Sequence, residues 1–171
     1  IDNEEGIESL QANAGVVAML ESIRSVVATA VGLVTGGNIA EEMRVRVNPF
    51  VLVVGTARTY TALSDETIDG ESIDLFSRCM CRWAFSKAYP ASGAIGTGVV
   101  CTIAGTIPAE MVRGGAPPAG KARKIRVGHP GGTLEAEAGV DESGLKVIRA
   151  TLGRTARILM EGTAFVRGQH I

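Results

Sequence analysis

Residues 125–138 read IRVGHPGGTLEAEA, and this stretch decides the fold prediction. Apolar and polar residues alternate on both sides of GHPGG, which is typical of strands with one buried face. Gly131 and Gly132 permit the backbone angles of a tight turn, so the stretch predicts a β-hairpin. It leaves open whether GHPGG is only a turn or also a loop that holds a ligand.

The sequence after residue 121 predicts an antiparallel sheet around this hairpin. Turn signals separate the alternating segments, namely the glycine pair of the hairpin, a Glu-Ser-Gly stretch at 142–144 and Gly153. Short connections of this kind favour a meander of neighbouring antiparallel strands. The expected strands are residues 123–127, 133–138, 145–152 and 154–165.

Two segments of the first half carry apolar side chains at steps of three and four residues, the pattern of an amphipathic helix. The first is residues 7–34, which the glycine pair at 36–37 would end. The second is residues 72–85, which Ser72 or Asp69 would cap. Apolar, β-branched and aromatic runs elsewhere predict strands at residues 49–54, 59–63 and 67–68.

Residues 93–107 predict a helix that contains no charged residue and follows an irregular link at 87–92. A helix that is apolar on every side must be surrounded by protein, so it is expected at the centre of its domain. A connection rich in glycine and proline, residues 108–121, leads from it to the hairpin. The resulting fold class is mixed α+β, a curved sheet wrapped around a buried helix.

Composition limits the partners and the compartment. The chain has 171 residues with a net charge of −1, so no strong field attracts nucleic acid or an anionic membrane. Glu21 and Arg24 break its longest apolar stretch, residues 15–34, which therefore predicts no membrane span. Three cysteines without paired spacing favour a reducing compartment, the cytoplasm. Because the sequence starts at Ile1 without a methionine, a processed or truncated chain is expected, and a mitochondrial presequence stays open.

Two nucleotide-binding patterns fail on their context. Residues 115–122 match the spacing of a phosphate-binding loop, but Pro117 and Pro118 lack the amide donors that such a loop needs. The glycines of residues 93–98 are spaced in the reverse order of a dinucleotide fingerprint, and no strand precedes them. Basic residues between 113 and 126 have no interleaved aromatic residues, which favours a solvated strand face over nucleic-acid binding.

Two stretches remain as candidate anion sites. Residues 92–98 place small residues at the start of a helix, where free amides and the helix dipole attract anions. Close packing between helix and sheet requires the same small residues and is the alternative. The role of GHPGG is equally open. His129 either faces a ligand or is structural, and the glycines suit a tight turn as well as a ligand-binding loop.

The stretch AYPASGAIGTGVVCTIAGTIP, residues 88–108, together with IRVGHPGGTLEAEA, resembles the second lobe of the methylaconitate isomerase family. That family includes aconitate delta-isomerases and 4-oxalomesaconate tautomerases. The resemblance implies a diaminopimelate epimerase-like lobe, with an antiparallel curved sheet around a central apolar helix. It also implies that residues 1–171 are the second, C-terminal lobe of a two-lobed isomerase whose first lobe is absent. Gly131 stands where the family usually has serine, so a serine contact is not carried over.

The resemblance implies a cofactor-independent isomerase that moves an allylic proton on an unsaturated tricarboxylate. The family's proton-transferring Lys and Cys lie in the first lobe, so no catalytic residue is assigned here, and Lys87 and Cys101 are not substitutes. This lobe is expected to clamp a substrate carboxylate with backbone amides, while His129 adds a hydrogen bond or shapes the loop. The expected binding residues are Ser92, Gly93, Ala94, His129, Gly131, Gly132 and Thr133. No metal and no cofactor are expected. The expected partners are the small-molecule tricarboxylate and the missing first lobe, and a homo-oligomer stays open.

Two other functions stay open. Epimerases of this fold carry a thiol where this chain has Ile95, and isoleucine cannot transfer a proton, which disfavours a two-base racemase. The remaining alternative is a non-catalytic binding or assembly lobe derived from such an enzyme. Turnover by the full-length protein would distinguish an isomerase or a racemase from such a non-catalytic lobe.

Overall fold

The structure is a computed structural model that describes residues 6–153 and 158–163. It confirms the α+β class, with a sheet rich in antiparallel pairs and a few helices. The helices are α1 (Ile7–Ala12), α2 (Ala14–Ala30), α3 (Ile39–Val45), α4 (Ala91–Val100), α5 (Ile107–Met111) and the short 3-10 helix η1 (Gly70–Ser72). The strands are β1 (Val51–Thr56), β2 (Tyr60–Thr61), β3 (Thr67–Ile68), β4 (Leu75–Cys81), β5 (Ala84–Phe85), β6 (Ala122–His129), β7 (Gly132–Val140) and β8 (Val147–Leu152).

The main sheet has six strands in the order β1-β4-β6-β7-β8, with β5 paired to β4. The expected antiparallel meander is confirmed as β6, β7 and β8. The pairing of β4 with β6 is parallel and joins Leu75 to Val127 and Phe76 to Gly128. Asp74 reinforces this seam, because its carboxylate accepts hydrogen bonds from the backbone N and the guanidinium of Arg126. The fourth expected strand lies partly outside the described residues, and residues 158–163 are not strand.

The prediction of a helix over residues 72–85 is wrong, because this segment contains the strand β4. Leu75 and Cys79 pack in the core beneath α4, whereas Phe76 and Met80 pack in two clusters on the opposite face. A strand buried on both faces shows no alternation of apolar and polar residues, so its sequence mimics a helical pattern. Asp69 does cap a helix, but it is the three-residue η1.

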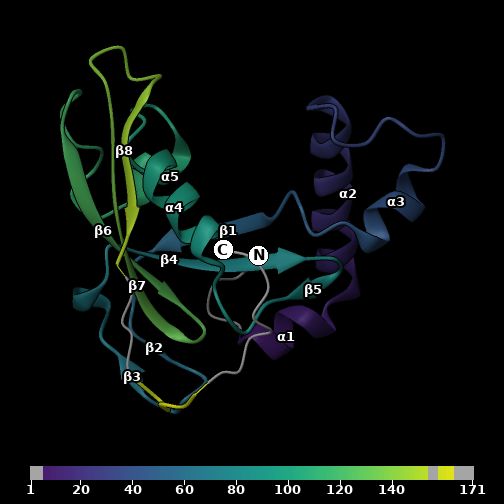
Figure 1. The fold of residues 1–171 in the computed structure, drawn as a ribbon, viewed down its shortest axis with the longest axis horizontal. Coiled ribbons are helices and arrows are strands. Elements are labelled where there is room, and N and C mark those ends of the chain that lie inside the picture. The colour runs from purple at the N-terminus through teal and green to yellow at the C-terminus, as the bar shows by residue number, and fades with distance from the viewer. Residues whose placement is uncertain (1–5, 154–157, 164–171) are drawn as a thin grey trace.

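The apolar helix is shorter than expected and is covered on one side only by the described chain. It ends at Val100, and a separate helix, α5, follows after a turn. Gly93, Ala94, Thr97 and Gly98 are buried, with Gly98 facing Ala136 of β7. Ser92 and Val100 are exposed, so the expected enclosure of this helix is not met within the described residues. Figure 1 shows α4 and α5 lying against the β6–β8 end of the sheet.

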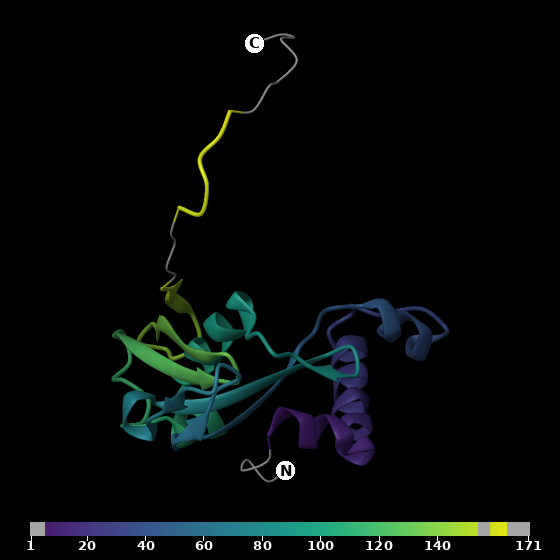
Figure 2. The ribbon, with the colours of Figure 1, turned by 90° about the horizontal axis from the view of Figure 1, so that it is seen from below.

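The helix expected over residues 7–34 is divided into α1 and α2 by Asn13, whose side chain accepts a hydrogen bond from the amide of Val16. It ends at Ala30, before the glycine pair at 36–37. A buried ion pair joins Glu21 and Arg24 within α2. Arg24 also donates to the Met43 and Arg46 carbonyls at the end of α3, and these hydrogen bonds hold α3 against α2. Figures 1 and 2 place α2 and α3 beside the end of the sheet away from β6–β8.

Candidate functional site

GHPGG is a hairpin turn between β6 and β7. His129 pairs with Gly132 as the last position of the ladder, and Pro130 and Gly131 form the connection. Gly132 has a φ of +124°, which an L side chain rarely adopts, so this position requires glycine. The amide of Gly131 donates to Nδ1 of His129 at 3.1 Å, and this hydrogen bond ties the imidazole to the backbone of the turn.

The hairpin formed by β2 and β3 holds this turn from one side. The Tyr60 hydroxyl donates to the Gly132 carbonyl and accepts from the backbone N of His129. The amide of Leu63 donates to the Pro130 carbonyl at 2.8 Å. The turn is therefore fixed by a second hairpin that lies about seventy positions earlier in the sequence, a contact for which the sequence contains no local signal.

His129 lies on the other side of the turn and is buried, with 7% of its surface exposed. Its ring stacks on Tyr89, with 5.6 Å between the ring centroids. Burial lowers the pKa of His129, which keeps the imidazole neutral near neutral pH. Because Nδ1 already accepts from Gly131, the proton of the neutral ring is on Nε2, which can donate to a ligand.

Tyr89 connects the turn to the start of α4, although sequence reasoning did not assign it to the site. Its hydroxyl makes hydrogen bonds of 2.7 Å to Ser77 of β4 and Thr97 of α4. Burial raises its pKa to about 12, so the phenol stays protonated and serves as a positioning group. Tyr89 thus fixes the imidazole against the sheet and the helix together.

The start of α4 offers fewer free amides than predicted. Pro90 is the N-cap and supplies no side-chain hydrogen bond, so the first helical amides have no partner within the helix. Ala94 is different, because its amide donates to the Pro90 carbonyl at 2.9 Å. Ser92 is exposed and Gly93 is buried against Pro90 and Leu52. The helix start therefore presents Ser92 and Gly93, and Ala94 is part of the helix ladder.

The structure brings the turn close to the segment that leads into α4. A Cβ on Gly131 would lie 3.3 Å from the Lys87 carbonyl. Gly131 and Thr133 are exposed, and the Gly131 amide is already bonded to Nδ1 of His129. Within the described residues no hydrogen bond joins residues 131–133 to residues 92–94. The site therefore combines two groups of amide donors and a neutral imidazole, an arrangement that can bind an anion.

Acid–base groups are scarce at this site. Burial raises the pKa of the Cys101 thiol to about 12, so it does not ionise at neutral pH. No group of three His, Cys, Asp or Glu side chains that could hold a metal ion occurs in the described ranges. Nor does any helix in that part of the chain combine the length and hydrophobicity needed to cross a membrane.

Comparisons with known proteins place this geometry in context. A family model described as "PrpF protein" matches residues 2–167. A 2-methyl-aconitate isomerase of Shewanella oneidensis is 32% identical over 94% of this chain and 38% of its own length. A 3-methylitaconate isomerase of Eubacterium barkeri is 32% identical over 92% of this chain and 40% of its own. A crystal structure of methylitaconate-delta-isomerase superposes with a TM-score of 0.78 at 28% identity, covering 99% of this chain and 45% of that one. The chain therefore spans less than half the length of the proteins it matches.

Proposed function

The chain belongs to the PrpF family, as its sequence resemblance indicated, and on this premise we propose that it is the second lobe of a two-lobed isomerase. The substrate class is an unsaturated tricarboxylate of the aconitate or methylaconitate kind. Two relatives support this, since their names give methylaconitate and oxalomesaconate, which are tricarboxylates, as substrates. A third is named for 3-methylitaconate, an unsaturated dicarboxylate. The three free cysteines agree with a cytoplasmic setting.

This lobe would bind a substrate carboxylate between the turn and the start of α4. The observation that carries this proposal is the stack of neutral His129 on Tyr89, which fixes the turn relative to the helix. Nε2 of His129 and the amides of Gly132, Thr133, Ser92 and Gly93 are the donors, while the Gly131 amide is bonded to Nδ1 of His129 and shapes the turn. Of the residues predicted from the sequence, Ala94 contributes through packing, because its amide is bonded to Pro90.

The reaction would be an allylic proton shift that needs no cofactor. A base removes a proton from a carbon next to the double bond, the C–H electron pair shifts the double bond by one position, and a proton returns at the far carbon. Negative charge spreads onto the neighbouring carboxylate during this step. Donors that are already oriented stabilise that charge, and one such donor is worth about 3 kcal/mol in other enzymes.

The base would come from the first lobe. At the described turn, Nδ1 of His129 is occupied by the Gly131 amide, and burial raises the pKa of Tyr89 to about 12. Cys101 lies at the far end of α4, as its C-cap, and burial raises its pKa to about 12 as well. These three groups are therefore poor bases at neutral pH. The role left to this lobe is to orient the substrate and to stabilise charge.

Proton NMR of the full-length protein with cis-aconitate in deuterated water tests the proposal. Conversion to an isomer with deuterium at an allylic carbon is expected. His129→Phe keeps an aromatic ring on Tyr89 but removes the Nε2 donor, and it should lower kcat/KM about tenfold or more. Lys124→Gln is the control, because this exposed side chain on the same strand pairs with Glu135 across the surface.

Two results would contradict the proposal in different ways. Unchanged kcat/KM in a folded His129→Phe protein would remove His129 from the clamp. The proposed isomerase activity would be refuted if the folded full-length protein neither converts cis-aconitate, methylaconitate or oxalomesaconate nor exchanges their protons with solvent. The second result would instead favour a non-catalytic binding or assembly lobe.

A further inference from the structure

The exposed side of α2 lacks the charged residues that a surface helix normally presents to water. The helix contains two charged residues, Glu21 and Arg24, and both are buried, with 2% and 1% of their surfaces exposed. Apolar side chains instead run along the exposed side at steps of three and four residues, as far as the C-cap. We call this row the outer stripe, and it consists of Met19, Ile23, Val26, Val27, Ala30 and Val31.

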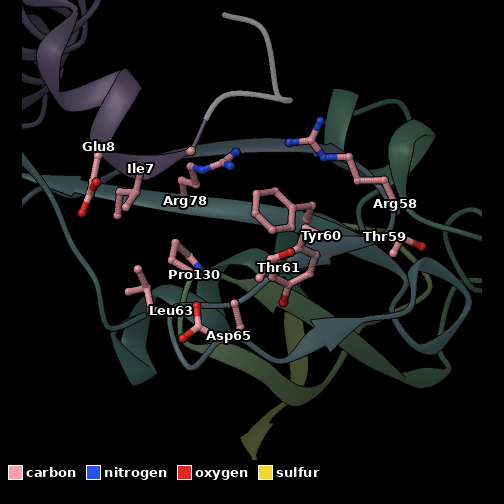
Figure 3. Close-up of a pocket in the computed structure, with 13 residues that line it drawn as sticks. Ile7, Glu8, Arg58, Thr59, Tyr60, Thr61, Leu63, Asp65, Arg78 and Pro130 are labelled. Atoms are coloured by element: carbon pink, nitrogen blue, oxygen red, sulfur yellow. The ribbon is translucent and has the colours of Figure 1, made fainter.

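The other side of α2 packs on the sheet, on the face opposite to α4. Leu20 of α2 shares a buried cluster with Met80 of β4, whereas the neighbouring Cys79 belongs to the cluster beneath α4. Because successive side chains of a strand point to opposite faces, α1 and α2 cover the face away from α4. The cavity between α1 and the β2–β3 hairpin lies on this same face, with Ile7 of α1 and Arg78 of β4 among its walls (Figure 3). The outer stripe therefore points away from the sheet.

The outer stripe and its surroundings are large enough for a protein interface. Its five large side chains are between 43% and 66% exposed. Trp83 lies beside α2, because its amide donates to Oε2 of Glu21 at 3.4 Å, and its side chain is half exposed. With Trp83 and the exposed Leu33, the stripe offers on the order of 700 Å², close to the roughly 800 Å² that each partner buries in a standard interface. Few charges and an aromatic residue are also typical of the core of an interface.

Two partners are candidates for this surface, the first lobe and a second copy of the protein. The proposed clamp is built on the α4 face of the sheet, where Tyr89 joins His129 to Thr97. A first lobe that closes over the clamp approaches that face, whereas α2 lies on the opposite face, at the end of the sheet away from β6–β8 (Figures 1 and 2). The choice of a second copy rests on this proposed two-lobed arrangement. An uncharged apolar stripe can also meet its own copy around a two-fold axis without repulsion between like charges.

We propose that the outer stripes of two copies pack against each other around a two-fold axis and make the protein a dimer. Removal of both apolar stripes from water stabilises this association. The axis crosses the middle of the stripe, so Ile23 and Val26 lie closest to their counterparts in the second copy. The clamp of each copy stays on the opposite face of its sheet and outside the interface.

Analytical ultracentrifugation of the full-length protein over a range of concentrations tests the proposal. The native protein should have twice the mass of one chain. Ile23→Glu places a charge in the middle of the stripe and should weaken dimerisation about thirtyfold or more, while the uncharged Ile23→Gln should weaken it less. Ile107→Glu is the matched control, because Ile107 is also an exposed isoleucine on a helix, α5, and it should leave the Kd unchanged. Circular dichroism checks that each variant is folded.

Two results would overturn the proposal. One is a native protein that sediments as a single chain at every concentration; a lower thermal midpoint of Ile23→Glu than of Ile107→Glu would then assign the stripe to the first lobe. The other is a dimer whose Kd is the same in the native protein and in folded Ile23→Glu, because such a dimer uses another surface. Turnover measured on the same samples keeps the two proposals apart. A native dimer that Ile23→Glu dissociates but that lacks turnover would refute the isomerase alone, and a single chain with turnover would refute the interface alone.

Discussion

Gly96→Ala and Gly98→Ala change two glycines on α4, and the structure predicts opposite effects on the free energy of unfolding. An added Cβ at Gly98 would lie 3.0 Å from the Cβ of Ala136 and 3.5 Å from that of Ala138. At Gly96 no heavy atom lies within 4 Å of the added Cβ. The two substitutions therefore share one chemical change and differ only in what the new methyl group meets.

The expected magnitudes follow from two opposing contributions. Alanine in a helix interior is favoured over glycine by about 1 kcal/mol, which applies at both positions. Forcing a methyl group into a close-packed contact costs about 1–3 kcal/mol, which applies only at Gly98. Ala136 and Ala138 are buried in β7 and are held by ladders on both sides, so they cannot move aside. Gly96→Ala should therefore stabilise the fold by about 0.5–1 kcal/mol, and Gly98→Ala should destabilise it by up to about 2 kcal/mol.

Urea unfolding followed by circular dichroism measures both changes, and the thermal midpoint should move by about 2–4 °C per kcal/mol. Ala136→Gly in the Gly98→Ala background removes the facing methyl group and should recover part of the loss. The double-mutant cycle should give a coupling of about 0.5 kcal/mol or more. Equal stabilisation by both alanines, or a coupling of zero, would refute the close approach of α4 to β7.

Three further predictions concern burial and charge. Glu21→Ala leaves the buried Arg24 without its partner and should cost about 3–5 kcal/mol of unfolding free energy. Glu42→Ala breaks only an exposed pair and should cost under about 0.5 kcal/mol; equal losses in urea unfolding would contradict this. Because burial lowers the pKa of His129, the unfolded chain takes up its proton first, so stability should fall as the pH drops below about 6.5. His129→Gln should flatten that slope, and an unchanged slope would assign it to another group. Burial raises the thiol pKa values of Cys79 and Cys101 to about 12, so only the partly exposed Cys81 should react quickly with a thiol reagent, and rapid reaction of all three in the folded protein would contradict this.

The hairpin and the meander could be predicted from the sequence because their signals are local. The strands β6, β7 and β8 alternate in polarity, and glycines mark the turn between the first two. Neighbours in the sheet are also neighbours in the sequence, so a short window contains the whole pattern. The strand expected at residues 49–54 corresponds to β1 at Val51–Thr56, and its signal is also local, an uninterrupted apolar run.

The parts that could not be predicted depend on contacts between distant segments. The strand β4 has no alternation because α4 covers one face while α1 and the β2–β3 hairpin cover the other. At the candidate site, Tyr60 and Tyr89 acquire their roles only when their segments meet the turn. The seven predicted binding residues remain a prediction, with the amide of Ala94 now assigned to the helix.

The parallel seam between β4 and β6 has a consequence for the order of folding. The hairpin β6–β7 and the next strand can pair early, because each closes only a short loop. Asp74 and Arg126 are 52 positions apart, so joining the two halves of the sheet requires closing a much longer loop. Two pairs of positions, a backbone hydrogen bond from the Asp74 amide to the Arg126 carbonyl and the Asp74 carboxylate hold this seam. The meander is therefore expected to gain protection from hydrogen exchange first, and docking of β4 onto β6 is expected to limit the folding rate.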